Sequence, residues 1–182
     1  MCRAAQAATA TTTAPSFTNL TQSEYVIVWN QTCTNSNGGL GGTVTGGSSA
    51  HGTLAVSSVD TVNSSATADG SFADGLKYTF NITVPDDETN LAMKFADWMN
   101  SAASSTIPVA NNMRISSLQA DNGDTPIVLT AANTYSSPAL HITGDLNPSM
   151  PGDQVQVTVE VAVPSNTVNG SYTTTYGVQT LP

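Results

Sequence analysis

Charged side chains are scarce in this sequence, and positively charged ones are almost missing. Charged residues make up 9% of the chain, with 4 basic and 13 acidic side chains and a formal net charge of −9. A typical soluble protein has about a quarter of its residues charged. So few cations cannot neutralise a row of phosphates, and an acidic chain is repelled by anionic lipid. We therefore expect neither nucleic acid nor a membrane surface as a partner.

Long hydrophobic runs are also missing. No segment approaches the roughly 20 apolar residues that cross a bilayer, so no membrane insertion is expected. The start of the chain lacks the apolar stretch of a secretion signal. Threonine, serine, asparagine and glycine supply the polarity instead, as in many secreted proteins, and we expect an extracellular or cell-surface location. Export would then require a signal upstream of Met1, or a natural start other than Met1.

Catalytic motifs are missing as well. The sequence has no Gly-x-Ser-x-Gly elbow, no His-Glu-x-x-His pair, no phosphate-binding loop and no dinucleotide fingerprint. His51 lies in a glycine-rich stretch and His141 in a predicted strand, and both are interpreted as structural side chains. We expect no enzyme activity and no cofactor.

Acidic residues gather in predicted turns, where calcium could bind through their oxygens. No complete set of calcium ligands is visible, so the alternative is that these carboxylates are simply solvated. A pair of glycosidase carboxylates is not singled out either. The residues are Asp86, Asp87 and Glu88 in one turn, Asp121 and Asp124 in a second, and Asp145 and Asp153 near a third.

The two cysteines, Cys2 and Cys33, lie near the N-terminus without a CxxC motif or a neighbouring histidine. This placement favours a disulfide over zinc ligation or free thiols. The bond can form within one chain or between two chains, and the sequence does not decide between them.

What the sequence does contain is a two-residue rhythm. Residues 154–163 alternate valine with polar or small residues, which predicts a strand with one buried face. Leu76–Val84 predicts another, with Tyr78, Phe80, Ile82 and Val84 facing inward. Residues 171–178 repeat the rhythm, so we expect the chain to end in a hairpin of 154–163 with 171–178.

Further strands complete an all-β pattern of eight to ten strands. Leu91–Trp98 also fits a helical stripe, but strand is favoured because its neighbours are strands. Residues 35–52 are too rich in glycine for a core and predict a loop or weak ribbon. The remaining predicted strands are Tyr25–Trp29, Leu54–Val59, Ala139–Ile142, and a hairpin of 113–115 with 126–129 through a tight turn at Asn122-Gly123.

This pattern predicts an antiparallel β-sandwich, immunoglobulin-like or jelly-roll, over residues 21–182. Residues 1–20 differ, because alanine and threonine dominate and offer little to a core. We expect an extended N-terminal arm, either disordered or suited to lying in a narrow groove as an added strand.

The stretch Val161–Tyr176 has a Val-Pro-Ser turn followed by Gly-Ser-Tyr. It resembles the closing hairpin of immunoglobulin-like domains on prokaryotic surface proteins. The resemblance implies an architecture and no activity.

The layout of an arm of small residues before one Thr/Ser/Asn-rich sandwich resembles that of extracellular filament subunits built by donor-strand exchange, including bacterial pilins, biofilm-matrix fibre proteins and archaeal threads. It implies a structural subunit that polymerises head to tail with copies of itself. Residues 155–163 and 171–178 would belong to the core or to the acceptor groove, and Cys2 could bond Cys33 of a neighbour. The implied donor strand comprises Ala4, Ala5, Gln6, Ala7, Ala8, Thr9, Ala10, Thr11, Thr12, Thr13 and Ala14.

The alternative function is a secreted carbohydrate-binding or adhesive module, with surface glycans as partners. Trp29, Trp98, Tyr135 and Tyr176 could form an aromatic platform for sugar rings, although core positions are favoured for them. Five Asn-x-Ser/Thr sequons are candidate glycosylation sites: Asn19, Asn30, Asn63, Asn81 and Asn169.

Overall fold

The computed structural model describes the chain in parts. For residues 9–11, 26–28, 31–34 and 43–45 it describes the backbone. For residues 52, 54–100, 102, 104–122, 125–170 and 172–181 it also describes the side chains.

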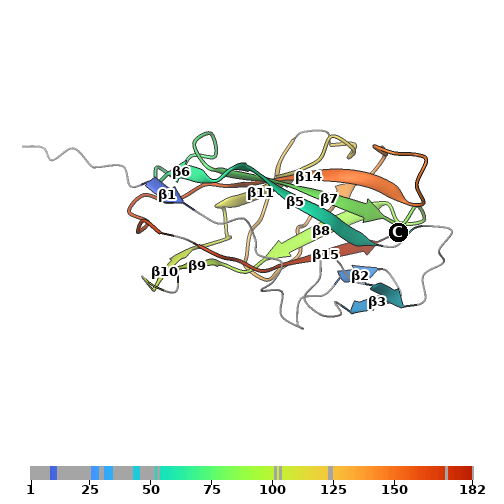
Figure 1. The fold of residues 1–182 in the computed structure, drawn as a ribbon, viewed down its shortest axis with the longest axis horizontal. Helices are drawn as coiled ribbons and strands as arrows, with labels where there is room; N and C mark the ends of the chain where they lie inside the picture. The colour runs from blue at the N-terminus through green and yellow to red at the C-terminus, as the bar shows by residue number, and fades with distance from the viewer. Residues whose placement is uncertain are drawn as a thin grey trace, which may run out of the picture.

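The described residues form an all-β fold, and most of its strands belong to two facing sheets (Figure 1). The five-stranded sheet has the order β12 (Ile127–Val128), β11 (Met113–Ser116), β14 (Asp153–Val161), β7 (Leu76–Val84) and β5 (Ala55–Asn63). The six-stranded sheet has the order β13 (Leu140–His141), β8 (Asn90–Phe95), β15 (Tyr176–Leu181), β2 (Val26–Val28), β3 (Gln31–Thr34) and β4 (Thr43–Thr45).

Two short ribbons complete the architecture. One pairs β9 (Trp98–Asn100) with β10 (Ser105–Ile107), and the other pairs β1 (Thr9–Thr11) with β6 (Ser65–Thr67). The predicted antiparallel β-sandwich is therefore confirmed. One pair departs from the antiparallel rule, because β15 runs parallel to β2.

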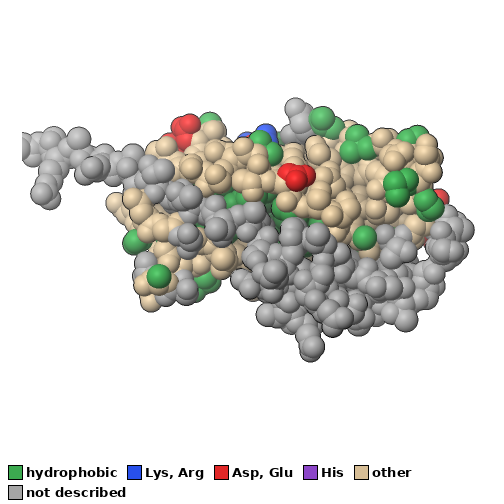
Figure 2. Space-filling view, viewed as in Figure 1, with side chains coloured by type: hydrophobic (Ala, Val, Ile, Leu, Met, Phe, Trp, Pro, Cys, Tyr) green, Lys and Arg blue, Asp and Glu red, His purple; other side chains and the backbone are tan. Residues whose placement is uncertain are grey.

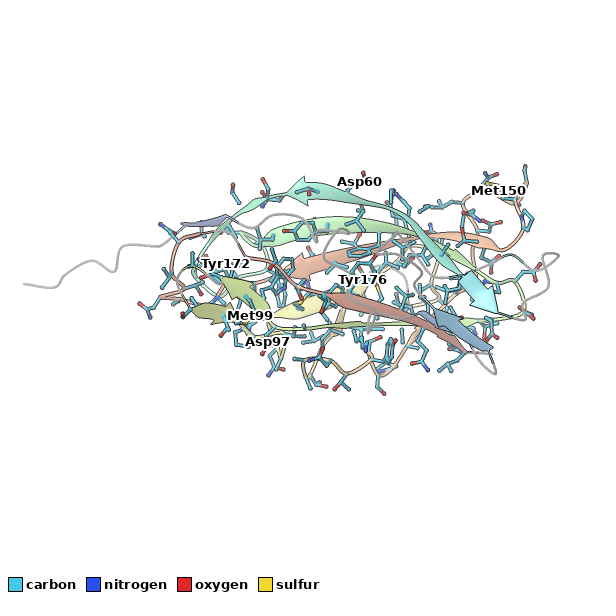
Figure 3. All side chains as sticks on the ribbon, turned by 60° about the horizontal axis from the view of Figure 1, so that its bottom comes forward. Asp60, Asp97, Met99, Met150, Tyr172 and Tyr176 are labelled. Carbon is cyan, nitrogen blue, oxygen red and sulfur yellow. The ribbon has the colours of Figure 1, made fainter. Side chains whose placement is uncertain are left out.

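The core lies between the two sheets and is built by alternation. In β7 the inward Tyr78 and Phe80 are fully buried, and in β14 the valines at 155, 157, 159 and 161 are at most 1% exposed. Phe80 meets Phe95 of β8 and Tyr176 of β15 edge to face, with ring centroids 6.0 Å and 5.0 Å away. Figure 3 shows Tyr176 between the layers. These rings join the sheets across the interior.

Several local predictions are confirmed. Leu91, Met93 and Phe95 are buried on strand β8, so the helical alternative at 91–98 is wrong. The strands predicted at 54–59 and 139–142 appear as β5 and β13. Within the glycine-rich segment 35–52, Thr43–Thr45 form β4, which pairs with β3, and residues 35–42 and 46–51 lie outside the described residues.

The predicted terminal hairpin is wrong. β14 and β15 lie in different sheets, and residues 162–175 carry the chain from one to the other. Both edges of β14 are already occupied, by β11 and β7, and β15 is likewise enclosed by β8 and β2. These two strands belong to the core, as expected, but neither can serve as an acceptor edge.

The predicted hairpin of 113–115 with 126–129 is confirmed as the β11–β12 pair, but residues 117–126 separate the two strands, so no two-residue turn joins them directly. The N–H of Thr125 donates to the carbonyl of Asn122 at 3.1 Å, while Gly123 and Asp124 lie outside the described residues. The N–H of Asp121 donates to the carbonyl of His141, and Ala120 forms a bridge with Ile142, so the connection is also tied to the other sheet.

Candidate functional site

The arm predicted as a donor strand is represented in the described residues by β1. It pairs antiparallel with β6 of the same chain, with Thr9 opposite Thr67, Ala10 opposite Ala66 and Thr11 opposite Ser65. The rest of the segment from Ala4 to Ala14 lies outside the described residues. Figure 1 shows β1 beside β6 at the left of the molecule, away from the C-terminal end of β15.

Backbone hydrogen bonds show which edge β1 occupies. The N–H of Thr67 donates to the carbonyl of Asp74 at 3.0 Å, on the side of the strand that leads into β7. Successive N–H groups of a strand point to opposite edges, so the N–H of Ala66 faces the other way, where Ala10 is its register partner. β1 therefore adds to the outer edge of the continuous strand formed by β5 and β6.

The edge next to β1 is built from small residues. Ala66 and Ala68 are 3% and 5% exposed and belong to the core cluster, while Ser64 and Ser65 face the solvent. An edge built from small residues suits pairing with an alanine- and threonine-rich segment.

The same outer edge continues along β5 with no further strand on it among the described residues. Two β-bulges interrupt β5, between Val56 and Ser58 and between Thr61 and Asn63. Bulges and short pairing segments are common ways of limiting uncontrolled edge-to-edge association. The β6 section is thus the regular part of this edge.

Three of the five sequons fall among described side chains. Asn63, at the end of β5, is exposed and donates to the carbonyl of Gly75 at 2.7 Å. Asn169 is exposed in the loop before β15. Asn81 faces outward but is half-buried, and its amide donates to Ser58 Oγ at 2.7 Å and to Asp60 Oδ2 at 3.2 Å. Asn19 and Asn30 lie outside the described residues.

The cysteines and histidines are described only in part. Cys33 is a residue of β3, while Cys2 and His51 lie outside the described residues. His141 is exposed at the end of β13, and its Nδ1 lies 2.9 Å from Asp121 Oδ2. This contact supports the structural interpretation of His141.

The described residues of the acidic turns do not assemble into a recognisable cation site. Among the described side chains, no group of three or more His, Cys, Asp or Glu residues could hold a metal ion. Asp145 instead caps its own loop, because its Oδ1 accepts from the N–H groups of Asn147 and Gln154. Burial, together with Asp145 and then Asp86, raises the pKa of Asp153.

Glu88 is the least exposed of the described carboxylates in these turns. It is 6% exposed, and its Oε2 has no hydrogen-bond partner. Burial, followed by repulsion from Asp87, raises the pKa of Glu88 above its ordinary value of 4.5. The charged form is therefore penalised in the folded state more than in the unfolded state.

This penalty predicts a stability that depends on pH. The destabilising penalty is fully present above the folded-state pKa of Glu88 and shrinks as pH falls through that value. The penalty is absent below 4.5, where Glu88 is protonated in both the folded and the unfolded state. Glu88→Gln should raise the free energy of unfolding at pH 7 by about 1 kcal/mol, and the gain should fade toward pH 4. Denaturant unfolding at several pH values measures it, with Asp74→Asn as an exposed control for the lost charge. A gain that is equal at all pH values would contradict the assignment.

The aromatic platform is not formed by the residues proposed for it. Trp98 is fully buried and stacks on Tyr78 with ring centroids 5.8 Å apart, and Tyr176 is 4% exposed. Tyr135 is half-buried, with Lys94 Nζ 5.3 Å from its ring centroid. Trp29 lies outside the described residues. Trp98 and Tyr176 are buried in the core because they lie on the apolar faces of their strands.

A site that the sequence did not predict lies on the outer face of the five-stranded sheet. Glu160 of β14 is opposite Arg114 of β11 and Lys77 of β7. Arg114 Nε lies 2.6 Å from Glu160 Oε2, and Lys77 Nζ lies 3.9 Å from Glu160 Oε1. The guanidinium also lies 4.3 Å above the ring of Phe72. We call Lys77, Arg114 and Glu160 the charged triad.

The visible surface in Figure 2 agrees with the composition, because uncharged polar atoms and backbone cover most of the coloured area and charged side chains are few. In the parts of the chain with described structure, no helix is long and apolar enough to cross a membrane. No protein-family model matches the sequence, and no curated protein matches it. The β6 edge and the charged triad are the candidate functional features of the described residues.

Proposed function

We propose that this protein is a structural subunit of an extracellular filament and that it polymerises by exchanging its N-terminal arm between copies. The observation that carries the proposal is the β1–β6 pairing, in which a segment of the arm forms a strand on an edge of the sandwich. In the polymer, β1 of one copy would pair with β6 of the next copy in the same register.

The exchange requires no new type of contact. The antiparallel ladder that closes within one chain can form between two chains, as in other swapped assemblies. Residues 12–25 connect β1 to β2 and span up to about 50 Å when extended, enough to reach a neighbouring molecule. A head-to-tail exchange does not close on itself, so it produces a fibre. Main-chain hydrogen bonds supply the affinity.

The composition is consistent with this role. A surface of hydroxyl and amide groups suits an exported structural protein, and we place the filament outside the cell. Cys2 precedes β1 and Cys33 lies in β3. A disulfide between them would secure the arm, either to its own sandwich or to that of the next subunit.

Engineered cysteines at the ends of the ladder test the exchange. Because Thr67 donates its N–H toward Asp74, Thr9 and Thr67 form a non-hydrogen-bonded pair, in which Cα atoms are about 4.5 Å apart and a disulfide fits. In a background of Cys2→Ser and Cys33→Ser, Thr9→Cys with Thr67→Cys should give a ladder of covalent oligomers on non-reducing electrophoresis.

The controls make this result decisive. The ladder should collapse on reduction, and Thr9→Cys alone should give dimers at most. If assembled protein instead gives only a monomer band with an internal disulfide, the arm remains on its own sandwich and the exchange proposal is wrong.

A carbohydrate-binding or adhesive role is the second candidate. It is supported by the charged triad, in which two cations flank one carboxylate on the outer face of the five-stranded sheet. Trp98 and Tyr176 lend it no support, because both rings are buried in the core.

A further inference from the structure

Two adjoining hollows lie on the outer face of the five-stranded sheet, with volumes of about 630 Å³ and 380 Å³. Both are lined by Lys77, Arg114 and Glu160, so the charged triad is their common wall. The larger hollow extends toward Phe72, and the smaller extends toward Leu118 and Pro126. Together they form one groove across β7, β14 and β11. Both volumes lie within the range of about 300–1,000 Å³ typical of ligand sites.

The groove carries a local positive charge in a strongly acidic chain. Its two cations exceed its one carboxylate, whereas the whole sequence has a net charge of −9. Arg114 is held from two sides, by Glu160 and by the face of Phe72. The Lys77 side chain is 43% exposed, and its nitrogen lies 3.9 Å from Glu160, so it can turn toward a ligand at little cost.

The groove favours a ligand with carboxylates and hydroxyl groups. All three strands beneath it are paired on both sides, so a peptide could not gain main-chain ladder bonds there. The available partners are side chains: the guanidinium, the ammonium group, and the hydroxyls of Ser71, Ser116 and Thr158. A fixed guanidinium suits a carboxylate, and hydroxyls suit the ring hydroxyls of a sugar.

We infer that this groove binds an acidic oligosaccharide, with a sugar carboxylate held between Lys77 and Arg114. This inference does not depend on strand exchange, because no residue that lines the groove belongs to β1 or β6, although Asn63 and the connection from β6 to β7 border its larger hollow. Such a site would let each subunit of a filament hold an acidic polysaccharide at regular intervals.

Titration calorimetry of the full chain with an oligogalacturonide of fixed length tests the inference, with its methyl ester as the matched neutral ligand. The acid form should bind and the ester should not. Lys77→Gln should weaken binding roughly fivefold, since it removes one charge-assisted contact. Lys94→Gln removes the same charge from the other sheet and should change binding less than twofold.

The inference is overturned if the acid form does not bind, if the ester binds equally well, or if the two lysine variants weaken binding equally. Polyglutamate binding as tightly as the sugar would also overturn it, because the site would then recognise charge alone. Filament formation by Lys77→Gln should match that of the parent chain, so the outcome is separate from that of the exchange experiment.

Discussion

Removal of residues 1–14 is expected to abolish filament formation and to leave a folded, soluble sandwich. The removed segment contains β1, the strand that would be donated. The described cluster of buried residues runs from Leu54 to Val178, and the truncation leaves all of these residues in place. A three-residue ladder contributes a few hydrogen bonds at about 1 kcal/mol each, so only a small loss of stability is expected. Electron microscopy and thermal unfolding measure the two effects.

A point substitution provides a finer version of the same test. Ala10→Pro removes the N–H that faces Ala66 and should block assembly, because the central bond of the ladder is lost. Thr11→Pro is the matched control, since the N–H of Thr11 points away from β6, and it should weaken assembly less. Fibres of normal yield from the truncated chain would show that the arm is not the donated strand. If truncation unfolds the protein, the comparison of the two proline variants decides instead.

The strands with strict alternation could be predicted from the sequence because a two-residue period reports which face is buried. The predicted bounds of β7 and of the valine strand β14 lie close to the observed ends, and the inward residues are the buried ones. The period does not report which strand lies alongside. That is why the rhythm of residues 171–178 predicts a hairpin with β14, although β15 pairs with β8 and β2 in the other sheet.

The candidate sites depend on register and were therefore harder to predict. Lys77, Arg114 and Glu160 are far apart in the sequence and meet only because β7, β14 and β11 pair in one particular alignment. The small residues of the N-terminal segment singled it out as a candidate strand, and three of them form β1. Its partner β6 was not, because Ser65–Thr67 is short and lacks a hydrophobic pattern. The signal for the triad is that two cations lie opposite one carboxylate on neighbouring strands. This signal can be read only when the register of β7, β14 and β11 is known.

Phe80→Ala is expected to destabilise the sandwich severely. Phe80 is fully buried in β7, and its ring contacts Phe95 and Tyr176 from the opposite sheet. Truncating a buried phenylalanine costs about 3–5 kcal/mol through lost transfer energy and the cavity left behind. That is a large part of the roughly 5–15 kcal/mol that holds a typical domain folded. Denaturant unfolding measures it, and the midpoint should fall sharply.

Two comparisons separate the inter-sheet contact from a general effect of truncation. Phe80→Leu keeps most of the volume and loses the edge-to-face geometry, so it should cost clearly less than alanine. Val128→Ala, on a side chain that is 42% exposed in β12, should change the free energy of unfolding by less than about 0.5 kcal/mol. A loss below about 1 kcal/mol for Phe80→Ala would mean that the two sheets do not pack through this ring.

Because strand exchange requires an intact sandwich to receive the arm, Phe80→Ala should also lower filament yield under conditions where the variant is partly unfolded. Filament yield should then return when the temperature is lowered enough to refold the variant.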